Sequence, residues 1–69
     1  MKTRYSVNVY PRADADQIIA HYENIDLHEA LKDVKRSFPL FWDQLFVTIF
    51  DYSTCTYAYR FQPLKSFWI

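Results

Sequence analysis

The chain has 69 residues, 51% of them hydrophobic and 20% aromatic, and its eight basic residues balance eight acidic ones. This length predicts that residues 1–69 form a single domain, which buries only about 60% of the surface that its unfolded chain exposes, so we expect no deep enzymatic cleft. The composition excludes an intrinsically disordered chain, and the zero net charge disfavours both electrostatic steering to nucleic acid and mimicry of DNA.

The compartment follows from what the sequence lacks. It contains no apolar run typical of a signal peptide and no stretch of roughly 20 apolar residues that would span a bilayer. Cys55 is the only cysteine and cannot form an internal disulfide, which favours a reducing compartment. We therefore expect a soluble cytoplasmic protein with no membrane contact. Glycine is absent, which excludes phosphate-binding loops of the Walker and Rossmann types.

The first predicted element is a strand at residues 5–10, YSVNVY, in which Tyr5, Val7 and Val9 alternate with the other side chains. Pro11 ends it because proline cannot donate to a β-ladder. The polar residues 12–16 then form a turn.

Residues 17–38 fit either one long helix or a strand followed by a helix. In a single helix, the apolar residues before and after Asp26 would lie on nearly opposite sides, leaving no common buried face. Divided at Asp26, residues 18–23 alternate as in a strand, and Asp26 to Glu29 has the form of a capping box. We therefore predict a strand and then a helix that ends by Phe38, because Pro39 disfavours helical geometry in the residue before it. A short helix capped by Asp14 or Asp16 is the alternative for the first segment.

The predicted helix carries one apolar stripe, at spacing i, i+3, i+4, i+7 and i+11. Its members are Leu27, Ala30, Leu31, Val34 and Phe38. The apolar connection 39–44 precedes two further strands, Leu45–Asp51 and Cys55–Phe61. The order is therefore ββαββ, which predicts an α+β fold: a small antiparallel sheet of three to four strands with one main helix packed on one face.

The faces of the last hairpin depend on its loop, because a slip of one residue exchanges them. A two-residue loop at Ser53-Thr54 would pair Phe50 with Tyr57, but it requires positive φ angles that serine and threonine adopt poorly. We prefer an odd-length loop, since it separates polar from apolar side chains better. It predicts that these residues turn inward under the helix: Val47, Ile49, Tyr57, Tyr59 and Phe61.

No second helix is predicted to cover the opposite face of the sheet. The apolar tail, with Phe67, Trp68 and Ile69, either folds back there or joins Phe46 and Phe50 in an exposed patch, and such patches mark interfaces. Aromatic residues and arginine are enriched at interfaces and their hot spots. The candidate partner-binding residues are Phe46, Phe50, Arg60, Trp42, Trp68 and Arg4. A basic helix patch is also possible, at Lys32, Lys35 and Arg36, although these side chains can equally pair with Glu29 and Asp33 on a solvated helix face.

No catalytic set is predicted. His21 and His28 lack metal-ligand spacing, and Cys55 has no neighbouring histidine to activate it. Asp14 and Asp16 flank a turn, which favours a loop role over metal binding or acid-base chemistry. We expect no metal, no cofactor and no enzymatic activity.

The strand-pair, helix, strand-pair layout, with YENIDLHEALKDV at the helix start and Leu27-x-Glu29-Ala30-Leu31 within it, resembles small proteins encoded by phages and mobile elements. Among these are the phage inhibitor of bacterial RNA polymerase and some anti-CRISPR proteins. The resemblance covers about a third of the chain and carries over no functional residue. It implies a stoichiometric inhibitor that blocks a host nucleic-acid-processing complex by steric occlusion in the host cytoplasm.

These observations favour a non-enzymatic module that binds a host protein or protein complex. Two alternatives use the same sheet face. The first is nucleic-acid binding by stacked aromatics and arginine, which the neutral charge makes less favourable. The second is a homodimer with a structural or accessory role.

Overall fold

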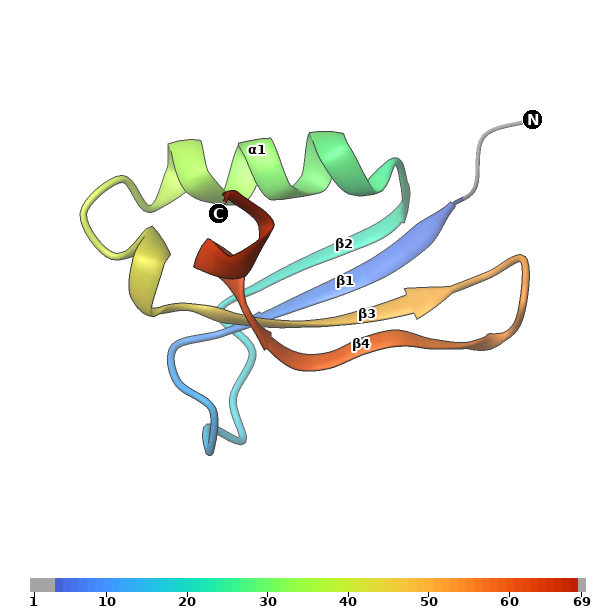
Figure 1. Cartoon of the computed structure of the whole chain (residues 1–69), viewed down its shortest axis with the longest axis horizontal. Coiled ribbons are helices and arrows are strands. Elements are labelled where there is room, and N and C mark those ends of the chain that lie inside the picture. The colour runs from blue at the N-terminus through green and yellow to red at the C-terminus, as the bar shows by residue number, and fades with distance from the viewer. Residues whose placement is uncertain (1–3, 69) are drawn as a thin grey trace.

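The computed structural model describes residues 4–68, and these form one sheet covered by one helix (Figure 1). The strands are β1 (Tyr5–Tyr10), β2 (Ala20–Ile25), β3 (Phe46–Asp51) and β4 (Thr56–Pro63), and the helix is α1 (Leu27–Ser37). Two 3₁₀ segments complete the fold, η1 (Trp42–Gln44) and η2 (Leu64–Trp68). The sheet has four antiparallel strands in the order β2-β1-β3-β4, so the predicted α+β architecture is confirmed.

Within residues 4–68, no helix is long and apolar enough to cross a membrane.

The predicted division at Asp26 is confirmed. Asp26 has an extended backbone, and its carboxylate accepts a hydrogen bond from the Glu29 N–H at 3.4 Å, which caps α1. The helix ends as expected: the Phe38 N–H donates to the Val34 carbonyl immediately before Pro39. The strand before the division begins at Ala20, and residues 11–19 form a long loop on the side of the sheet away from α1 (Figure 1).

The core lies between α1 and the inner face of the sheet, which is the face toward the helix. Val7, Val9, Val47 and Ile49 are fully buried there. The predicted helix stripe covers them: Ala30, Leu31 and Val34 are buried, while Leu27 and Phe38 pack at the margin. Leu45 and Leu64 extend the core. The burial of Leu64 was not predicted, because the sequence analysis placed the apolar tail that it begins outside the core.

The β3–β4 hairpin differs from the preferred register. Phe50 pairs with Tyr57, and residues 52–55 form the loop, so the prediction of an odd-length loop is wrong. Of the inward pairs that the odd-length loop predicted between β3 and β4, only Ile49 opposite Tyr59 is observed. Tyr57 therefore shares the outer face of the sheet with Phe50, because directly paired residues lie on the same face.

Two register shifts in β4 explain this mixture. An extra residue in one strand of a pair reverses the alternation of side chains beyond it. At the second shift, Phe61 has a φ of 51°, and its N–H donates to the Thr48 hydroxyl at 3.3 Å. Phe61 consequently contacts Tyr10 on the outer face, with ring centroids 4.7 Å apart, and its predicted inward position is also wrong.

The glycine-free sequence places other residues where glycine is usually favoured. Asn24, Cys55 and Phe61 have positive φ angles of 53°, 56° and 51°. Asparagine tolerates this conformation well, whereas for phenylalanine it is a genuine outlier. Cys55 closes the β3–β4 turn, where its Sγ lies 3.6 Å from the Tyr52 carbonyl oxygen.

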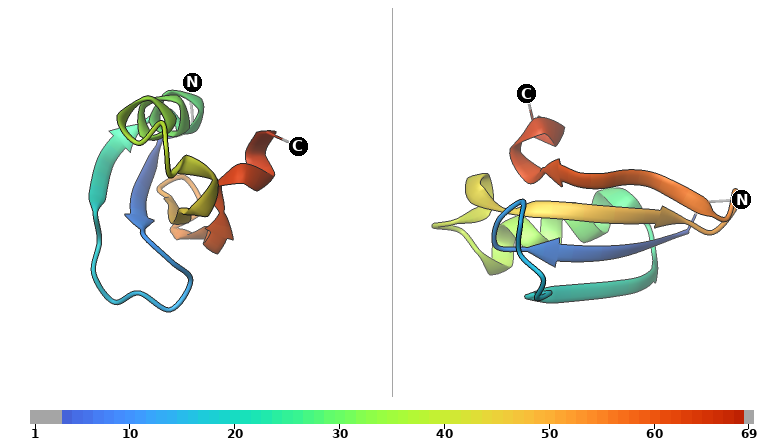
Figure 2. Two further views of the ribbon diagram at one scale, coloured as in Figure 1. Left: turned by 90° about the vertical axis from the view of Figure 1, so that its left-hand side faces the viewer. Right: turned by 90° about the horizontal axis from the view of Figure 1, so that it is seen from below.

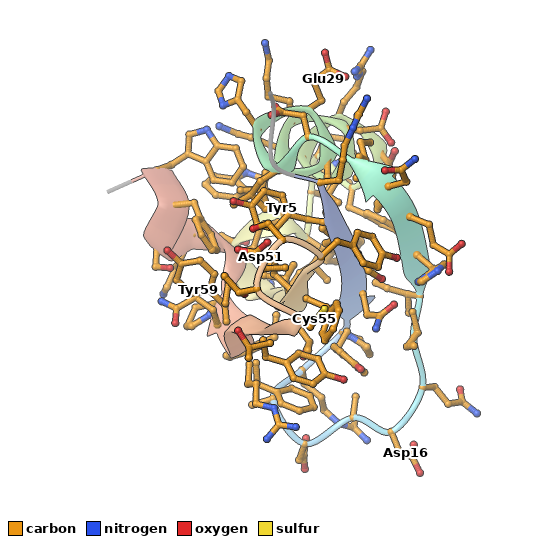
Figure 3. The ribbon with its side chains drawn as sticks, turned by 90° about the vertical axis from the view of Figure 1, so that its right-hand side faces the viewer. Tyr5, Asp16, Glu29, Asp51, Cys55 and Tyr59 are labelled. Atoms are coloured by element: carbon orange, nitrogen blue, oxygen red, sulfur yellow. The ribbon has the colours of Figure 1, made fainter. Side chains whose placement is uncertain are left out.

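The apolar tail folds to the side opposite the one considered in the sequence. Segment η2 lies on the same side of the sheet as α1 (Figure 1) and packs next to η1. Leu64 is buried in the core and Phe67 packs against it. Tyr59 is directed toward η2 (Figure 3), and its ring meets that of Phe67 at 5.2 Å. The expectation for Ile69 falls outside the described residues.

Candidate protein interface

No helix formed by residues 4–68 lies over the outer face of the sheet, the face opposite α1 (Figure 2, right). Its β1–β2 half is polar. His21 Nδ1 contacts Asn8 Oδ1 across the two strands, and His21 Nε2 lies 3.2 Å from a Glu23 carboxylate oxygen. These pairs satisfy one another locally, so this half resembles an ordinary solvated sheet face.

The β3–β4 half of the outer face is aromatic, and we call it the aromatic strip. Its members are Tyr10, Phe46, Phe50, Tyr52, Tyr57, Phe61 and the stacked Arg60. Phe50 meets Tyr57 and Tyr52 edge to face, with ring centroids 5.2 and 5.7 Å apart. At the other end of the strip Tyr10 pairs with Phe46 across the strands and contacts Phe61. The rings thus form two clusters, one around Phe50 near the β3–β4 turn and one with Tyr10 and Phe61 at the other end, where Tyr10 belongs to the neighbouring strand β1.

The strip is only partly shielded from water. Tyr57 is 49% exposed, Phe61 41% and Tyr52 42%. Phe46 and Phe50 are half-buried, and Thr48 beneath the strip is buried, with its hydroxyl accepting the Phe61 N–H. The sequence analysis placed the half-buried Phe46 and Phe50 in the exposed patch, whereas it assigned the more exposed Tyr57 and Phe61 to the core.

Arg60 supplies the positive charge of the strip. Its guanidinium carbon lies 4.5 Å from the centre of the Tyr57 ring, a cation–π geometry. Among the ion pairs of the described residues, none involves Arg60. Asp51, at the end of β3, is held by the Ser53 hydroxyl and N–H, and these hydrogen bonds lower the pKa of its carboxyl. The guanidinium therefore remains available to a carboxylate from outside.

The structure brings together three of the candidate partner-binding residues, Phe46, Phe50 and Arg60. It places Arg4 elsewhere: its Nη1 donates to the Asn24 carbonyl at 3.3 Å, toward the β2 edge of the sheet and away from β4. Trp42 and Trp68 lie on the inner side with α1, so they belong to a different surface.

Those two tryptophans form what we call the tail clamp, together with Lys35 of α1. The indole centroids are 5.5 Å apart in an edge-to-face arrangement. The Lys35 ammonium lies 4.4 Å from the Trp42 ring centre and 4.9 Å from that of Trp68. The clamp ties η2 to η1 and α1, which indicates a structural role for both tryptophans.

The predicted basic helix patch is divided by the fold. Lys35 belongs to the tail clamp, whereas Lys32 and Arg36 line an open groove of about 500 Å³ between α1 and β2. Arg36 lies 3.5 Å from Asp33, so the groove carries paired charges.

Tyr22 crosses the same groove, donating its hydroxyl to Asp33 at 2.7 Å. Burial, followed by the hydrogen bond and negative charge of Asp33, raises the pKa of Tyr22 to about 12. This pair closes the β2 edge of the core, as the tail clamp closes the β4 edge.

The residues with potential chemistry are scattered. Asp16 lies in the 11–19 loop and Glu29 on α1, at opposite sides of the molecule (Figure 3), and Asp14 pairs with Arg12 at 3.0 Å. Residues 4–68 contain no group of three histidine, cysteine or acidic side chains that could hold a metal ion. No family model, no curated protein and no solved structure matches the chain.

Sequence reasoning missed Tyr57, Phe61 and Tyr10 as members of the surface. A signal was present for Tyr57, because the Phe50–Tyr57 pairing was considered and set aside on turn propensity alone. No such signal existed for Phe61, since its position depends on a positive φ at a phenylalanine. Only the three-dimensional structure reveals that bulge.

Proposed function

We propose that this chain is a non-enzymatic binding module that docks a partner protein through the aromatic strip. The observation that carries the proposal is the exposure of Tyr57 and Phe61, at 49% and 41%, beside an arginine with no ion pair among the described residues. An apolar patch rimmed by polar groups is typical of an interaction site.

The residue types support a protein partner. Tyrosine and arginine are both enriched at hot spots. Tyrosine buries a large area at a modest cost in conformational entropy because its side chain has only two χ angles, and arginine adds a planar group that can donate two parallel hydrogen bonds. The strip presents its rings already packed against one another, so binding needs little further ordering of these side chains. A pre-organised surface of this kind suits a partner with a flat apolar patch.

The charge of the strip indicates the complementary chemistry. Arg60 projects one positive charge over Tyr57, and Asp51 is occupied by Ser53. We therefore expect the partner surface to combine apolar side chains with a carboxylate opposite Arg60. A guanidinium prefers such a partner because it can donate two parallel hydrogen bonds to it.

The mode of action follows from size and from the resemblance to phage-encoded inhibitors. A domain of 69 residues with a flat docking face acts by covering a surface of its partner. We propose that the partner is a component of a host nucleic-acid-processing complex in the cytoplasm and that the bound module blocks access to it.

The test is affinity capture from a nuclease-treated lysate of the native host, with bound proteins identified by mass spectrometry. Wild-type bait is compared with the double variant Tyr57→Ala/Arg60→Ala, whose positions are exposed, and with Lys32→Ala on α1 as a matched control. We expect a specific protein with wild type and control, and its loss with the double variant. Equal capture by all three baits, with unchanged circular dichroism, would contradict the proposal.

Nucleic-acid binding by the strip is the competing function, favoured by the Arg60–Tyr57 stack. It predicts binding to single-stranded RNA or DNA that weakens steeply as salt increases. A fluorescence anisotropy titration at low and high salt distinguishes the two: the protein-binding proposal predicts no saturable binding at either concentration.

A further inference from the structure

Strand β2 lies at one edge of the sheet, beside the helix. In the order β2-β1-β3-β4 it has a neighbouring strand on one side only, and Figure 2 shows it at the flank of the sheet next to α1. An edge strand presents a row of backbone N–H and C=O groups that pair with no other strand. The outward side of β2 therefore has the hydrogen-bonding pattern that a further strand would complete.

The two edges of the sheet differ in how well they are protected. At the opposite edge, β4 contains two register shifts and ends at Pro63, and both features disfavour the addition of a strand. β2 contains neither proline nor lysine, and Ala20 to Tyr22 keep one register against β1. Its single shift comes later, around Asn24, whose carbonyl accepts a hydrogen bond from Arg4. The regular part of this edge is thus long enough for a short strand.

The open groove of about 500 Å³ between α1 and β2 follows the same edge. The residues that line it are Tyr22, Ile25, Glu29, Lys32, Asp33 and Arg36. Successive side chains of a strand point to opposite faces, so a strand added to β2 would direct every second side chain toward α1 and into this groove. Backbone pairing and side-chain recognition can therefore act on the same segment.

The charged groups of the groove are unequally engaged. Asp33 is occupied, because one carboxylate oxygen accepts the Tyr22 hydroxyl at 2.7 Å and the other lies 3.5 Å from Arg36. Among the ion pairs of the described residues, none involves Lys32 or Glu29, and both side chains are exposed. The groove therefore offers a free carboxylate near the start of α1 and a free ammonium further along the helix.

We propose that this groove is a second binding site, in which an extended segment of a partner protein adds to β2 as an antiparallel strand. Strand addition beside a groove is a common mode of peptide recognition, in which main-chain hydrogen bonds give affinity and pockets for alternate side chains give specificity. Every strand pair of the described sheet is antiparallel, and this arrangement is slightly more stable than a parallel one. The site is separate from the aromatic strip, which lies on the other face.

The direction of α1 predicts the sequence pattern of the segment. The helix runs back along β2 (Figure 1), so Glu29 lies toward the end of β2 and Lys32 toward its middle. An antiparallel segment meets Glu29 first, so its inward side chains are expected to be basic, then apolar, then acidic. A second copy of this chain matches this pattern less well, because the inward side chains of its own regular edge, Ala20 and Tyr22, include no acid or base.

Peptide titrations of the isotope-labelled full chain, followed by NMR, test this proposal. The probe is the blocked peptide TKTVTET, and the matched control is TETVTKT, which has the same composition and the reverse order of charges. We expect the probe to bind with a dissociation constant on the order of 100 µM to 1 mM and to shift the amides of residues 20–22. The control should bind about fivefold more weakly, because exposed ion pairs contribute little each. TKPVPET should show no binding, since its prolines remove donors that the ladder requires.

Exchanging the two free charges gives the sharpest variant. In Glu29→Lys/Lys32→Glu both positions are exposed and the net charge is unchanged, and the preference between the two peptides should reverse. Tyr57→Ala/Arg60→Ala, on the other face, should bind the probe as wild type does.

Four results would overturn the proposal. They are no binding of TKTVTET at about 5 mM, binding of TETVTKT or TKPVPET as tight as that of the probe, an unchanged preference in the exchange variant, and shifts at residues 20–22 that depend on protein concentration without peptide. The last result would identify a second copy as the occupant. None of them bears on partner capture by the aromatic strip, which the strip variants test separately.

Discussion

The inner face of the sheet and the aromatic strip on its outer face are both apolar, yet they are built from different residues and differ in how far water reaches them. On the inner face Val7, Val9, Val47 and Ile49 are fully buried under α1. On the outer face the rings of the aromatic strip remain partly exposed to water, Tyr57 at 49% and Phe61 at 41%, and Arg60 stacks on Tyr57.

The difference teaches that apolar content alone does not identify a core. Branched aliphatic side chains have no polar atoms and fill space between packed layers, so they stabilise the fold most where water is excluded. Tyrosine and arginine keep a polar end in water while their apolar parts cover the sheet. The outer face is thus stable in the free protein and still offers apolar area to a partner.

The largest effect should come from truncating matched neighbours on the two faces. Ile49→Ala should cost about 3–4 kcal/mol in the free energy of unfolding, because it leaves a cavity in a fully buried site. A domain this small has only about 3–5 kcal/mol in total, so the variant should be largely unfolded at room temperature. Phe50→Ala, on the outer face, should cost about 1 kcal/mol. Urea denaturation measures both, and equal losses would show that the faces do not differ.

An exchange of similar shapes sharpens the comparison. Val47→Thr should cost about 2 kcal/mol, since it buries a hydroxyl on the inner face. Thr48→Val adds apolar area, yet it should cost about 1 kcal/mol because the Phe61 N–H loses its acceptor. The measurement is again urea denaturation. A higher free energy of unfolding for Thr48→Val than for wild type would contradict this expectation, because it would mean that added apolar area on the outer face outweighs the lost hydrogen bond.

Variants of the tail clamp test how much the contacts at the β4 edge of the inner face contribute to the free energy of unfolding. Trp68→Ala removes one edge-to-face ring contact and one cation–π contact, and should cost about 1.5 kcal/mol. Lys35→Gln should cost about 1 kcal/mol, whereas Lys32→Gln, one turn earlier on α1 and outside the clamp, should be nearly neutral. Thermal unfolding followed by tryptophan fluorescence reports the effect. Equal melting temperatures for the two lysine variants would remove the clamp from the account.

The smallest effect concerns the β2 edge and depends on pH. The pKa of Tyr22 is raised from 10.0 to about 12, so the folded chain holds this proton more tightly than the unfolded chain. Its contribution is fully present below pH 10 and is lost as the pH rises from 10 to 12. Because the group is partly exposed, we expect only about 1 kcal/mol.

Tyr22→Phe should therefore lower the stability at pH 8 and flatten its decline above pH 10 relative to wild type. Denaturation midpoints of the variant and of wild type, taken at pH 8 and at a pH above 10, measure this difference. Tyr52→Phe, at an exposed ring near the β3–β4 turn, is the control and should decline as wild type does. An unchanged slope in Tyr22→Phe would contradict the raised pKa of Tyr22, which burial and then the contact with Asp33 produce.

Much of this fold was predictable because it depends on local rules. The Asp26 cap, the helix stripe and the stop at Pro39 are short-range signals, and the structure agrees with each. The alternation in β1 and β3 likewise predicted the aliphatic half of the core. These features need only the geometry of a helix or a strand.

The rest depends on contacts that sequence spacing does not encode. The register of β4 changes twice, and at one of the two shifts Phe61 has a positive φ while its N–H donates to the Thr48 hydroxyl. The C-terminal segment η2 packs on the inner side of the sheet because Trp68 contacts Lys35 of α1, which also contacts Trp42 of η1. The site was therefore predicted in part. Its strands and three of its members, Phe46, Phe50 and Arg60, were named, whereas Tyr10, Tyr57 and Phe61 were not.

The most direct test of the central claim is the affinity of the captured partner for Tyr57→Ala, measured by isothermal titration with purified proteins. The account predicts at least a tenfold rise in the dissociation constant, because an exposed ring of the strip becomes buried on docking, with the free energy of unfolding changed by less than about 1 kcal/mol. A dissociation constant within about threefold of wild type would contradict the assignment of the outer face as the docking surface.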